Sequence, residues 1–402
     1  MSKRVVLVLF LFCFIHAEVQ AQLAVKAGTV YTMNGEPIRD GVVLVNNGKI
    51  EAVGPADRVQ IPDNYEVHEA TVVTPGLVDA HTVVGLAGIF NQESDQDQLD
   101  DSDPIQPQLR AIDAYNARED LVKLVLEKGI TTVHTGHGPG AIASGQTMIA
   151  KTAYNTVEEA VIDSASAVAF TLGSMVERFF DSPGTRSKGV AMLRQAFIEA
   201  REYADKRSAD DPAKRPSRNL KMEALADVLD GKLKAMITAH KARDIMTALR
   251  LQEEFGFEMI LDGAAEAYLL IDEIREAGVP VFIHPTMTRT YGDTRNASFT
   301  TAAKLAEAGI PFAFQSGYEG YVPKTRIILF EAAIAVANGL PKQQGLRALT
   351  IEPARLLGID DRVGSLEEGK DADIVLYDGD PFEYTTHITS VIVDGSIVKP
   401  DD

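Results

Sequence analysis

The sequence has almost no cysteine: Cys13 is the only one among 402 residues. It lies within the first 21 residues, which we predict to be removed, so the mature chain would have no disulfide and no thiolate chemistry. The apolar run at residues 5–15 is too short to span a bilayer. Positive charge is also scarce, with 39 Lys and Arg against 58 Asp and Glu. This balance argues against nucleic acid or an anionic membrane surface as a partner.

The N-terminus has the three regions of a secretory signal. Lys3 and Arg4 precede the apolar run, and the residues 19–21 (VQA) stand before Gln22. We therefore predict a signal peptide at residues 1–21 and an exported protein, periplasmic or secreted. After cleavage we expect no association with a membrane.

Both ends of the mature chain are rich in strand and turn residues. Residues 22–71 contain the apolar stretch GVVLV followed by NNG at residues 46–48, which is typical of a tight hairpin. Residues 359–402 likewise alternate apolar runs with Gly and Asp turns. We predict that the two ends combine into a small β-sandwich domain.

The middle of the chain, residues 72–358, alternates short apolar runs with amphipathic segments, as βα units do. Eight strands predict the α/β class, a TIM-like (β/α)8 barrel whose chemistry would lie at the carboxyl ends of its strands. The predicted strands are residues 72–78, 130–134, 146–151, 165–172, 235–239, 258–261, 279–283 and 310–315. The clearest predicted helices are residues 116–128, 187–206, 242–255, 264–277, 300–308 and 326–337.

Two motifs bracket this barrel. PGLVDAH at residues 75–81 and GSLEEGKDADIVLYDGDP at residues 364–381 resemble the amidohydrolase superfamily. The segments between them are similar to its imidazolonepropionase-like and secreted cyclic-imidodipeptidase-like branch. The resemblance implies a barrel that hydrolyses C–N bonds other than peptide bonds, at one or two divalent metals held by His, carboxylated Lys and Asp.

Most of the ligands that this resemblance implies are missing. His81 and His240 match the ligands after the first and fifth strands. The other four positions have none of the expected ligands, and are Val83, Ala169, Gly263 and Ser316. A catalytic metal needs about three protein ligands, so the inherited site would be incomplete.

Further histidines follow other predicted strands. His134 and His137 come after the second strand and His284 after the seventh. We predict a rebuilt site of His81, His134, His240 and His284 that holds one divalent transition metal at most, with zinc as first choice. The alternative is that each histidine is a hydrogen-bonded residue of a polar pocket and that no metal binds.

Two side chains are candidate catalytic bases. Asp262 stands beside the empty sixth-strand position, and His137 would act if it stays uncoordinated. Asp262 has a plainer alternative, which is to cap the helix that begins near residue 264.

Five polar residues are candidate substrate contacts. Gln146 and Lys151 belong to the third predicted strand, Arg289 and Tyr291 to a long loop after the seventh, and Tyr318 follows the eighth. Arginine in a mouth loop suits a carboxylate. The alternatives are a strand-end salt bridge for Lys151, a plain surface loop for Arg289 and Tyr291, and packing for Tyr318.

Two functions follow from these patterns. The first is an exported, metal-dependent amidohydrolase that acts on cyclic amides or dipeptide-like substrates through a reduced or rebuilt histidine site. The alternative is a pseudoenzyme that binds a ligand or partner protein in the old pocket. In either case we expect a small-molecule ligand, and barrels of this sort often pair, which leaves a homo-oligomer open.

Overall fold

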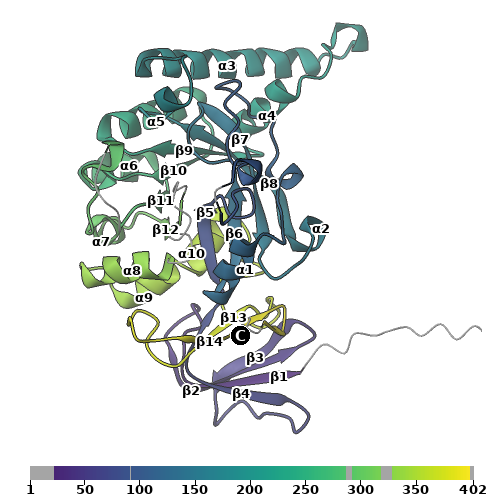
Figure 1. Ribbon diagram of the computed structural model, residues 1–402, viewed down its shortest axis with the longest axis vertical. Coiled ribbons are helices and arrows are strands. Elements are labelled where there is room, and N and C mark those ends of the chain that lie inside the picture. The colour runs from purple at the N-terminus through teal and green to yellow at the C-terminus, as the bar shows by residue number, and fades with distance from the viewer. Residues whose placement is uncertain (1–21, 91, 287–291, 318–327, 399–402) are drawn as a thin grey trace, which may run out of the picture.

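The computed structural model describes residues 22–398 apart from residue 91, residues 287–291 and residues 318–327. Two β-sheets organise these residues, one built from both chain ends and one from the middle of the chain (Figure 1). The predicted signal peptide, residues 1–21, lies outside the described residues. Across the described ranges, none of the helices combines the length and apolar character needed to cross a membrane.

The sheet from the chain ends has seven strands in the order β15-β14-β13-β4-β1-β2-β3. Its strands are β1 (Leu23–Val30), β2 (Ile38–Asn46), β3 (Lys49–Pro55), β4 (Glu66–Pro75), β13 (Ile374–Tyr377), β14 (Ile388–Val393) and β15 (Ser396–Val398). The two ends meet where β13 pairs antiparallel with β4. Alternate residues such as Val25, Val43 and Ile374 share one buried core, so a single continuous sheet curls around its own apolar face.

The second sheet has eight strands in the order β12-β11-β10-β9-β8-β7-β6-β5. They are β5 (Leu77–Thr82), β6 (Ile130–Gly136), β7 (Ala143–Lys151), β8 (Val161–Thr171), β9 (Lys234–Ala239), β10 (Met259–Gly263), β11 (Val281–Ile283) and β12 (Phe312–Phe314). The backbone N–H of Gly317, just beyond β12, donates to the carbonyl of His81 at 3.0 Å and brings the two edges together. The predicted α/β barrel is therefore confirmed, and the two chain ends, predicted to form a small β-sandwich, combine into one separate seven-stranded sheet.

One strand runs against the expected direction. β7 is antiparallel to both β6 and β8, whereas the other neighbouring pairs of this sheet are parallel. Only residues 137–142 separate β6 from β7, and residues 152–160 separate β7 from β8. A parallel crossover needs a dozen or more residues, so these connections can only make hairpins.

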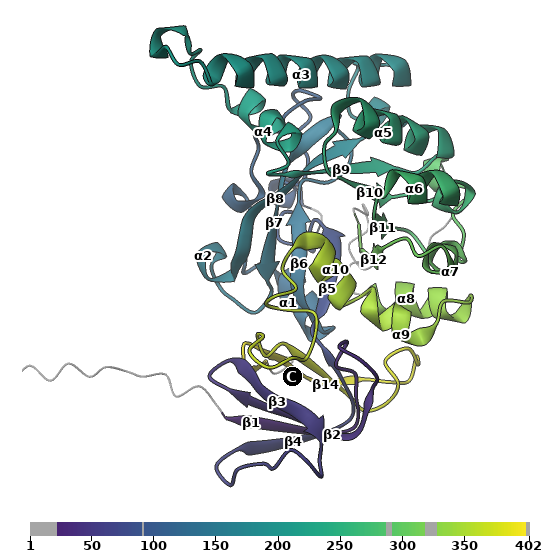
Figure 2. The same cartoon turned by 180° about the vertical axis from the view of Figure 1, so that it is seen from behind.

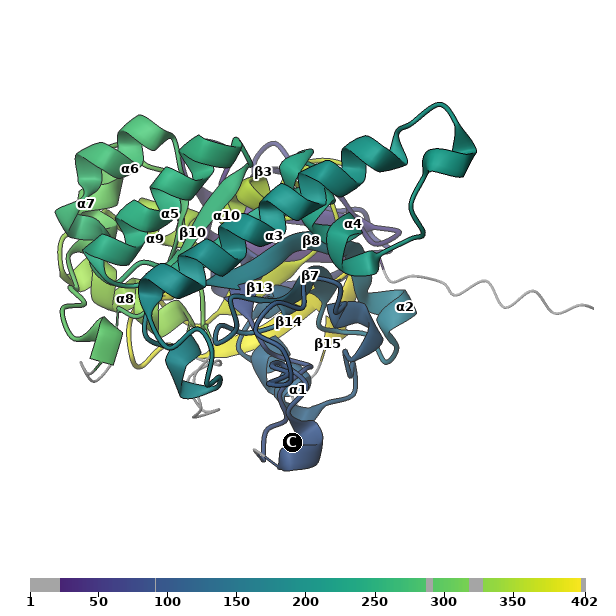
Figure 3. The ribbon, with the colours of Figure 1, turned by 90° about the horizontal axis from the view of Figure 1, so that it is seen from above.

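The helices lie outside the barrel sheet, as the view from above shows for α3, α5, α6 and α7 (Figure 3). The helices are α1 (Asp120–Glu127), α2 (Val157–Ala160), α3 (Arg186–Arg207), α4 (Leu220–Leu229), α5 (Ala242–Phe255), α6 (Ile271–Ala277), α7 (Thr301–Glu307), α8 (Ile328–Ala337), α9 (Lys342–Arg347) and α10 (Ile351–Leu357). Short 3-10 turns are η1 (Glu93–Asp95), η2 (Ala111–Asp113), η3 (Val176–Arg178), η4 (Pro212–Lys214), η5 (Ala267–Leu269) and η6 (Gly292–Thr294). Their buried faces form the main core with the outer face of the barrel strands.

The chain passes from one sheet to the other at Gly76. β4 continues to Pro75 in the chain-end sheet and β5 begins at Leu77, so the strand predicted at residues 72–78 is divided between the sheets (Figure 2). A Cβ at Gly76 would lie 2.1 Å from Oγ1 of Thr131. Only glycine fits this crossing point without displacing β6.

Candidate active site

Polar side chains form a layer inside the barrel, near the carboxyl ends of its parallel strands. Residues two apart on a strand share a face, and one buried apolar layer inside the barrel includes Met236, Ile260, Phe282 and Ala313. The residues two positions further along are polar, namely Thr238, Asp262, His284 and Gln315. We call this set, together with His81 and His240, the mouth layer.

Asp262 is the centre of the mouth layer. Its Oδ1 lies 3.0 Å from Nδ1 of His81 and accepts a hydrogen bond from Nε2 of Gln315 at 2.6 Å. Its Oδ2 accepts the hydroxyl of Thr238 at 2.6 Å. Asp262 caps no helix, because the N-cap residues of η5 and α6 are Glu266 and Leu270.

The environment of Asp262 keeps it ionised. Burial by itself would raise the pKa of Asp262, but His81 and the hydrogen bonds from His81 and Thr238 outweigh burial and hold that pKa below its usual value. The carboxylate therefore accepts the proton on Nδ1 of His81. The other ring nitrogen, Nε2 of His81, is buried and hydrogen-bonds to none of the residues that the structure describes.

A second carboxylate joins the first barrel strand to the last. Asp79 accepts the backbone N–H of Ser316 at 3.0 Å and its hydroxyl at 2.5 Å, and also the backbone N–H of His81 at 3.3 Å. Burial raises the pKa of Asp79 to about 6 despite these bonds. Ser316, which stands where the resemblance implies an Asp ligand, thus fixes the edge of the barrel beside His81.

His134 is fully buried and has no nitrogen left for a ligand. Its Nδ1 donates to the carbonyl of Ala80 at 2.7 Å, and its Nε2 accepts from the hydroxyl of Thr147 at 2.7 Å. Burial lowers the pKa of His134 to about 3, which keeps the ring neutral. The prediction that His134 binds a metal is therefore corrected: it is a hydrogen-bonded residue between β5, β6 and β7.

His240 lies near Asp262, against Gly263. Gly263 has a φ of +75°, and a Cβ there would lie 2.5 Å from Cε1 of His240, so the imidazole fills the space that a side chain at 263 would need. Burial, together with His284 nearby, lowers the pKa of His240 to about 4. The charge of His240 would also act on Asp262. Gly317 makes similar room for His284, with a Cβ position 2.9 Å from its Cδ2.

His137 stands apart from the mouth layer. It follows β6, and its ring lies so close to Gly145 that a Cβ at 145 would be 2.1 Å from Cδ2 of His137. Burial lowers the pKa of His137 to about 4, against the opposing charge of Asp100. These neighbours place it beside the β6–β7 hairpin and the acidic loop after β5.

The donors present do not fit the predicted zinc site. His134 is fully hydrogen-bonded, and Asp262 accepts three hydrogen bonds that a metal ion would have to displace. Among residues 22–398, leaving out the three gaps, no three His, Cys, Asp or Glu side chains are grouped to hold one ion. This corrects the predicted four-histidine ligand set, because a catalytic zinc needs about three protein ligands.

The predicted substrate contacts divide into three groups. Gln146 lies at the β7 end nearest the mouth and donates to the carbonyl of Pro107 at 3.3 Å. Lys151 lies at the opposite end of the barrel, because β7 is reversed, and its Nζ binds Asp371 at 2.8 Å, Asp373 at 3.1 Å and also Asp394. The substrate role of Lys151 is therefore corrected to a salt-bridge cluster with the chain-end sheet. The remaining candidates, Arg289, Tyr291 and Tyr318, lie outside the described residues.

Reasoning from sequence missed the residues that hold the acidic groups. Gln315 and Ser316 stand where the resemblance implies a Thr-Asp pair, and it implies no role for Thr238, yet each of the three donates to Asp262 or Asp79. Their common signal is position: each lies near the carboxyl end of a barrel strand, where side chains of different strands converge.

Known proteins share both this chain's sequence pattern and its fold. The Amidohydrolase family pattern matches residues 72–400. The amidohydrolase tasK of Hapsidospora irregularis is 25% identical over 403 aligned residues, which cover 89% of this chain but only 39% of that protein. An imidazolonepropionase of Caldanaerobacter subterraneus is 24% identical over 396 residues, covering 89% of this chain and 90% of the relative. The crystal structure of an amidohydrolase from Thermotoga maritima MSB8 aligns with a TM-score of 0.87 and 31% identity, over 94% of this chain and 100% of that one.

The family pattern covers most of the chain, from residue 72 to residue 400. The alignment with the Thermotoga maritima structure covers 94% of the chain and therefore includes both sheets. The chain therefore belongs to the Amidohydrolase family, a family of hydrolases that act on C–N bonds and generally depend on divalent metals.

Proposed function

We propose that this chain hydrolyses a C–N bond in a cyclic amide or dipeptide-like substrate, with His81 as the general base and Asp262 as the residue that orients it. The observation that carries the proposal is the buried contact of 3.0 Å between Nδ1 of His81 and Oδ1 of Asp262, which leaves Nε2 of His81 without a partner among the described residues. A base held by a third group in this way is the recurrent arrangement for activating a nucleophile.

The chemistry would proceed in two proton transfers. Nε2 of His81 takes a proton from a water molecule while the water oxygen bonds to the carbonyl carbon of the substrate. The C–N bond then breaks, and the same proton passes from His81 to the leaving nitrogen. Asp262 stays ionised throughout and stabilises the imidazolium that forms in between.

His240 would complete the site as a neutral donor. Its pKa of about 4 keeps the imidazole uncharged at neutral pH, and its Nδ1 is buried without a hydrogen bond in the described part of the chain. A neutral imidazole can polarise a carbonyl through an N–H group, as it does in other barrel enzymes. In this proposal His240 binds the carbonyl oxygen on which negative charge develops.

This mechanism departs from the metal chemistry that is general in the family. No step is assigned to a metal ion, because the Asp262 carboxylate is already bonded to His81, Thr238 and Gln315, and the described His, Cys, Asp and Glu side chains are not grouped in threes around an ion. The predicted base role of Asp262 changes for the same reason: its carboxylate already accepts three hydrogen bonds, so it orients His81.

A second candidate is a protein that binds a small ligand without hydrolysing it. The observation that favours it is that the two buried carboxylates beside His81 are fully engaged, since Asp79 and Asp262 each accept three hydrogen bonds from protein groups. In either case we propose that the chain is exported, as the N-terminal pattern of Lys3, Arg4 and the apolar run predicts. N-terminal sequencing of the secreted protein would find Gln22 as its first residue.

The test compares turnover, metal content and two histidine variants. The mature protein is incubated with a panel of cyclic amides, imidazolonepropionate and dipeptides, with and without a strong chelator, and its metals are measured by elemental analysis. We expect hydrolysis that survives chelation and is lost in His81→Gln. His387→Gln is the matched control, because His387 forms the same kind of pair with Asp378, at 3.1 Å, on the surface.

Two outcomes would overturn the assignment to His81. Hydrolysis that requires about one equivalent of metal, and returns when zinc is restored, would show that the family chemistry is retained. Saturable binding of a panel compound with no product in either histidine variant or the parent protein would instead favour the ligand-binding candidate.

A further inference from the structure

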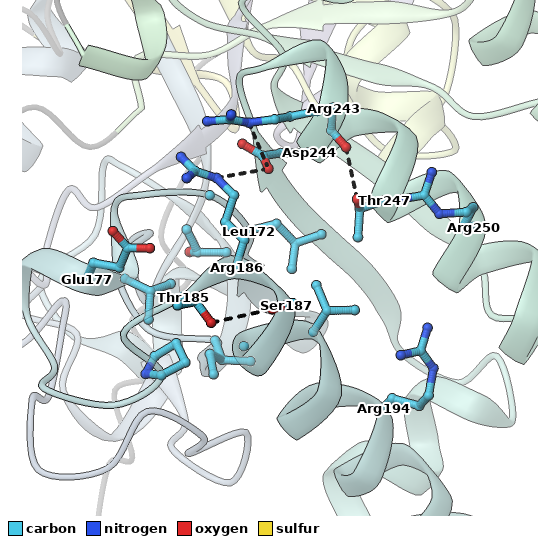
Figure 4. Close-up of a pocket in the computed structure, with 17 residues that line it drawn as sticks. Leu172, Glu177, Thr185, Arg186, Ser187, Arg194, Arg243, Asp244, Thr247 and Arg250 are labelled. Carbon is cyan, nitrogen blue, oxygen red and sulfur yellow. Dashed lines mark hydrogen bonds and ion pairs between the residues drawn. The ribbon is translucent and has the colours of Figure 1, made fainter.

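A cavity of about 410 Å³ opens between α3 and α5, beside the end of β8 (Figure 4). Its floor includes Thr171, Leu172 and Gly173, at and just after the end of β8. None of the mouth-layer residues lines it. The cavity is therefore a separate site from the one assigned to hydrolysis.

The two helices present matching faces to this cavity. Arg243, Thr247 and Arg250 follow one another along α5, and Ser187 and Arg194 lie one above the other on α3. Residues spaced by three, four or seven share one side of a helix. Arginine side chains therefore stand on both walls, and Figure 4 shows the four guanidinium groups distributed around the opening.

The guanidinium groups are unequally neutralised. Arg194 pairs with Glu254 at 2.7 Å, and Arg186 lies 3.3 Å from Asp244. Arg243 reaches Asp244 only at 3.9 Å. Within the described ranges Arg250 meets no carboxylate and bonds only to the hydroxyl of Thr247, at 2.8 Å. Arg250 therefore keeps N–H donors that an anion in the cavity could use.

Two further features select the kind of anion. The N-termini of α3, a helix of 22 residues, and α5, a helix of 14, both begin at the cavity, so their dipoles add positive potential there. Leu172, Val176 and Val190 supply an apolar part of the lining. The site thus offers a cationic end and an apolar wall within one cavity.

We propose that this cavity binds an organic anion, with a carboxylate or phosphate head on Arg250 and a short apolar body against Val176 and Val190. The proposal does not depend on the hydrolytic role of His81. A planar guanidinium binds either head group through paired N–H donors, so both sources share one recognition chemistry.

The experiment is a binding titration at low ionic strength with hexanoate, hexyl phosphate and 1-hexanol as probes, followed by calorimetry or saturation-transfer NMR. We expect one or both anions to bind, 1-hexanol not to bind, and Arg250→Gln to weaken the anions about tenfold. Arg58→Gln is the matched control, because Arg58 is an exposed arginine just after β3, far along the chain from the cavity. Val190→Phe, which narrows the apolar wall, should also weaken binding.

The relative affinity of hexanoate and hexyl phosphate identifies the head group. If neither anion binds at concentrations up to about 10 mM, the proposal is overturned. An affinity that Arg250→Gln and Val190→Phe leave unchanged would also overturn it, because the anion would then bind elsewhere. Retention of binding in Arg58→Gln with its loss in Arg250→Gln would support the assigned site.

Discussion

Nδ1 of His81 lies 3.0 Å from Oδ1 of Asp262, and both side chains are almost completely excluded from solvent. The two residues are 181 positions apart in the sequence, on β5 and β10. Barrel closure brings them together, and Thr238 and Gln315 hold the carboxylate in place. A pair positioned in this way has one orientation of the imidazole and one tautomer.

Replacing Asp262 by Asn should therefore damage turnover far more than folding. The amide can donate to Nδ1 of His81, which would move the ring proton to Nε2 and remove the base. By the effect of the same exchange in Asp-His pairs of other hydrolases, we expect kcat to fall by about 10³- to 10⁴-fold. Steady-state kinetics on the best panel substrate would measure this. Thr238→Val, which removes one hydrogen bond but keeps the carboxylate, should cost much less, and equal losses in the two variants would contradict the pairing.

Acid should destabilise the fold between about pH 6.5 and pH 4. Burial lowers the pKa of His134 to about 3 and those of His137 and His240 to about 4. In this window these histidines are protonated in the unfolded chain but neutral in the folded chain. The free energy of unfolding therefore falls as pH falls, by about 1.4 kcal/mol per pH unit for each histidine. Asp79, whose pKa is raised to about 6, binds its proton first in the folded chain and offsets about one histidine.

The variant His134→Gln tests this sign. It should be less stable than the parent protein at pH 7, because the hydrogen bonds to Ala80 and Thr147 are disturbed. Its free energy of unfolding should nevertheless fall less steeply towards pH 5, because unfolding of the variant takes up about one proton fewer than unfolding of the parent protein. Urea unfolding at both pH values would measure the two slopes, and identical slopes would refute the assignment.

Gly263→Ala should displace His240. An alanine at φ +75° costs about 1 kcal/mol, and its Cβ would also press on the imidazole at 2.5 Å, adding about 1 to 3 kcal/mol. Gly256→Ala is the matched control, since Gly256 has a φ of +77° with nothing within 4 Å of the Cβ position. Urea unfolding should find the difference between the two variants, and only Gly263→Ala should lower turnover.

Lys151→Met should destabilise the chain by about 3 to 5 kcal/mol, because it leaves the buried Asp373 without its cation, whereas Asp371 keeps Lys49 and Arg362. Lys49→Met is the control: Lys49 also pairs with Asp371, at 2.5 Å, but its side chain is 51% exposed and should contribute about 1 kcal/mol or less. Urea unfolding would compare them. A Lys151→Met protein that folds stably but cannot bind substrate would restore the predicted substrate role.

The sequence is sufficient for the elements of the barrel because alternation and helical periodicity are local. The strand predicted at residues 235–239 is β9 (Lys234–Ala239), and the helix predicted at residues 242–255 is α5 (Ala242–Phe255). The direction of β7 cannot be predicted from such local patterns, because a strand has the same alternation of side chains whichever way it runs. Only the short connections on either side of β7 indicate a hairpin, and the prediction of a regular barrel passed over them.

The sequence predicts which residues belong to the site but not which of them are hydrogen-bonded to one another. His81, His240 and Asp262 were each expected at strand ends, and the structure brings them together. Their pairing was not predictable, because it depends on side-chain reach across the barrel and on donors such as Gln315 that no motif identifies. Lys151 shows most clearly that the position of a side chain depends on strand direction. Because β7 is reversed, Lys151 lies at the end of the barrel opposite the mouth layer.

The reversal of β7 also affects the order in which the chain can assemble. β6, β7 and β8 form an antiparallel meander over residues 130–171, whose pairings join segments close together in the sequence. Contacts of this kind close small loops and form early, whereas the seam between β5 and the segment after β12 spans more than half the chain. The meander is thus a self-contained starting structure on which the parallel strands can be added, and the His81–Asp262 pair would form only when the last of them closes the ring.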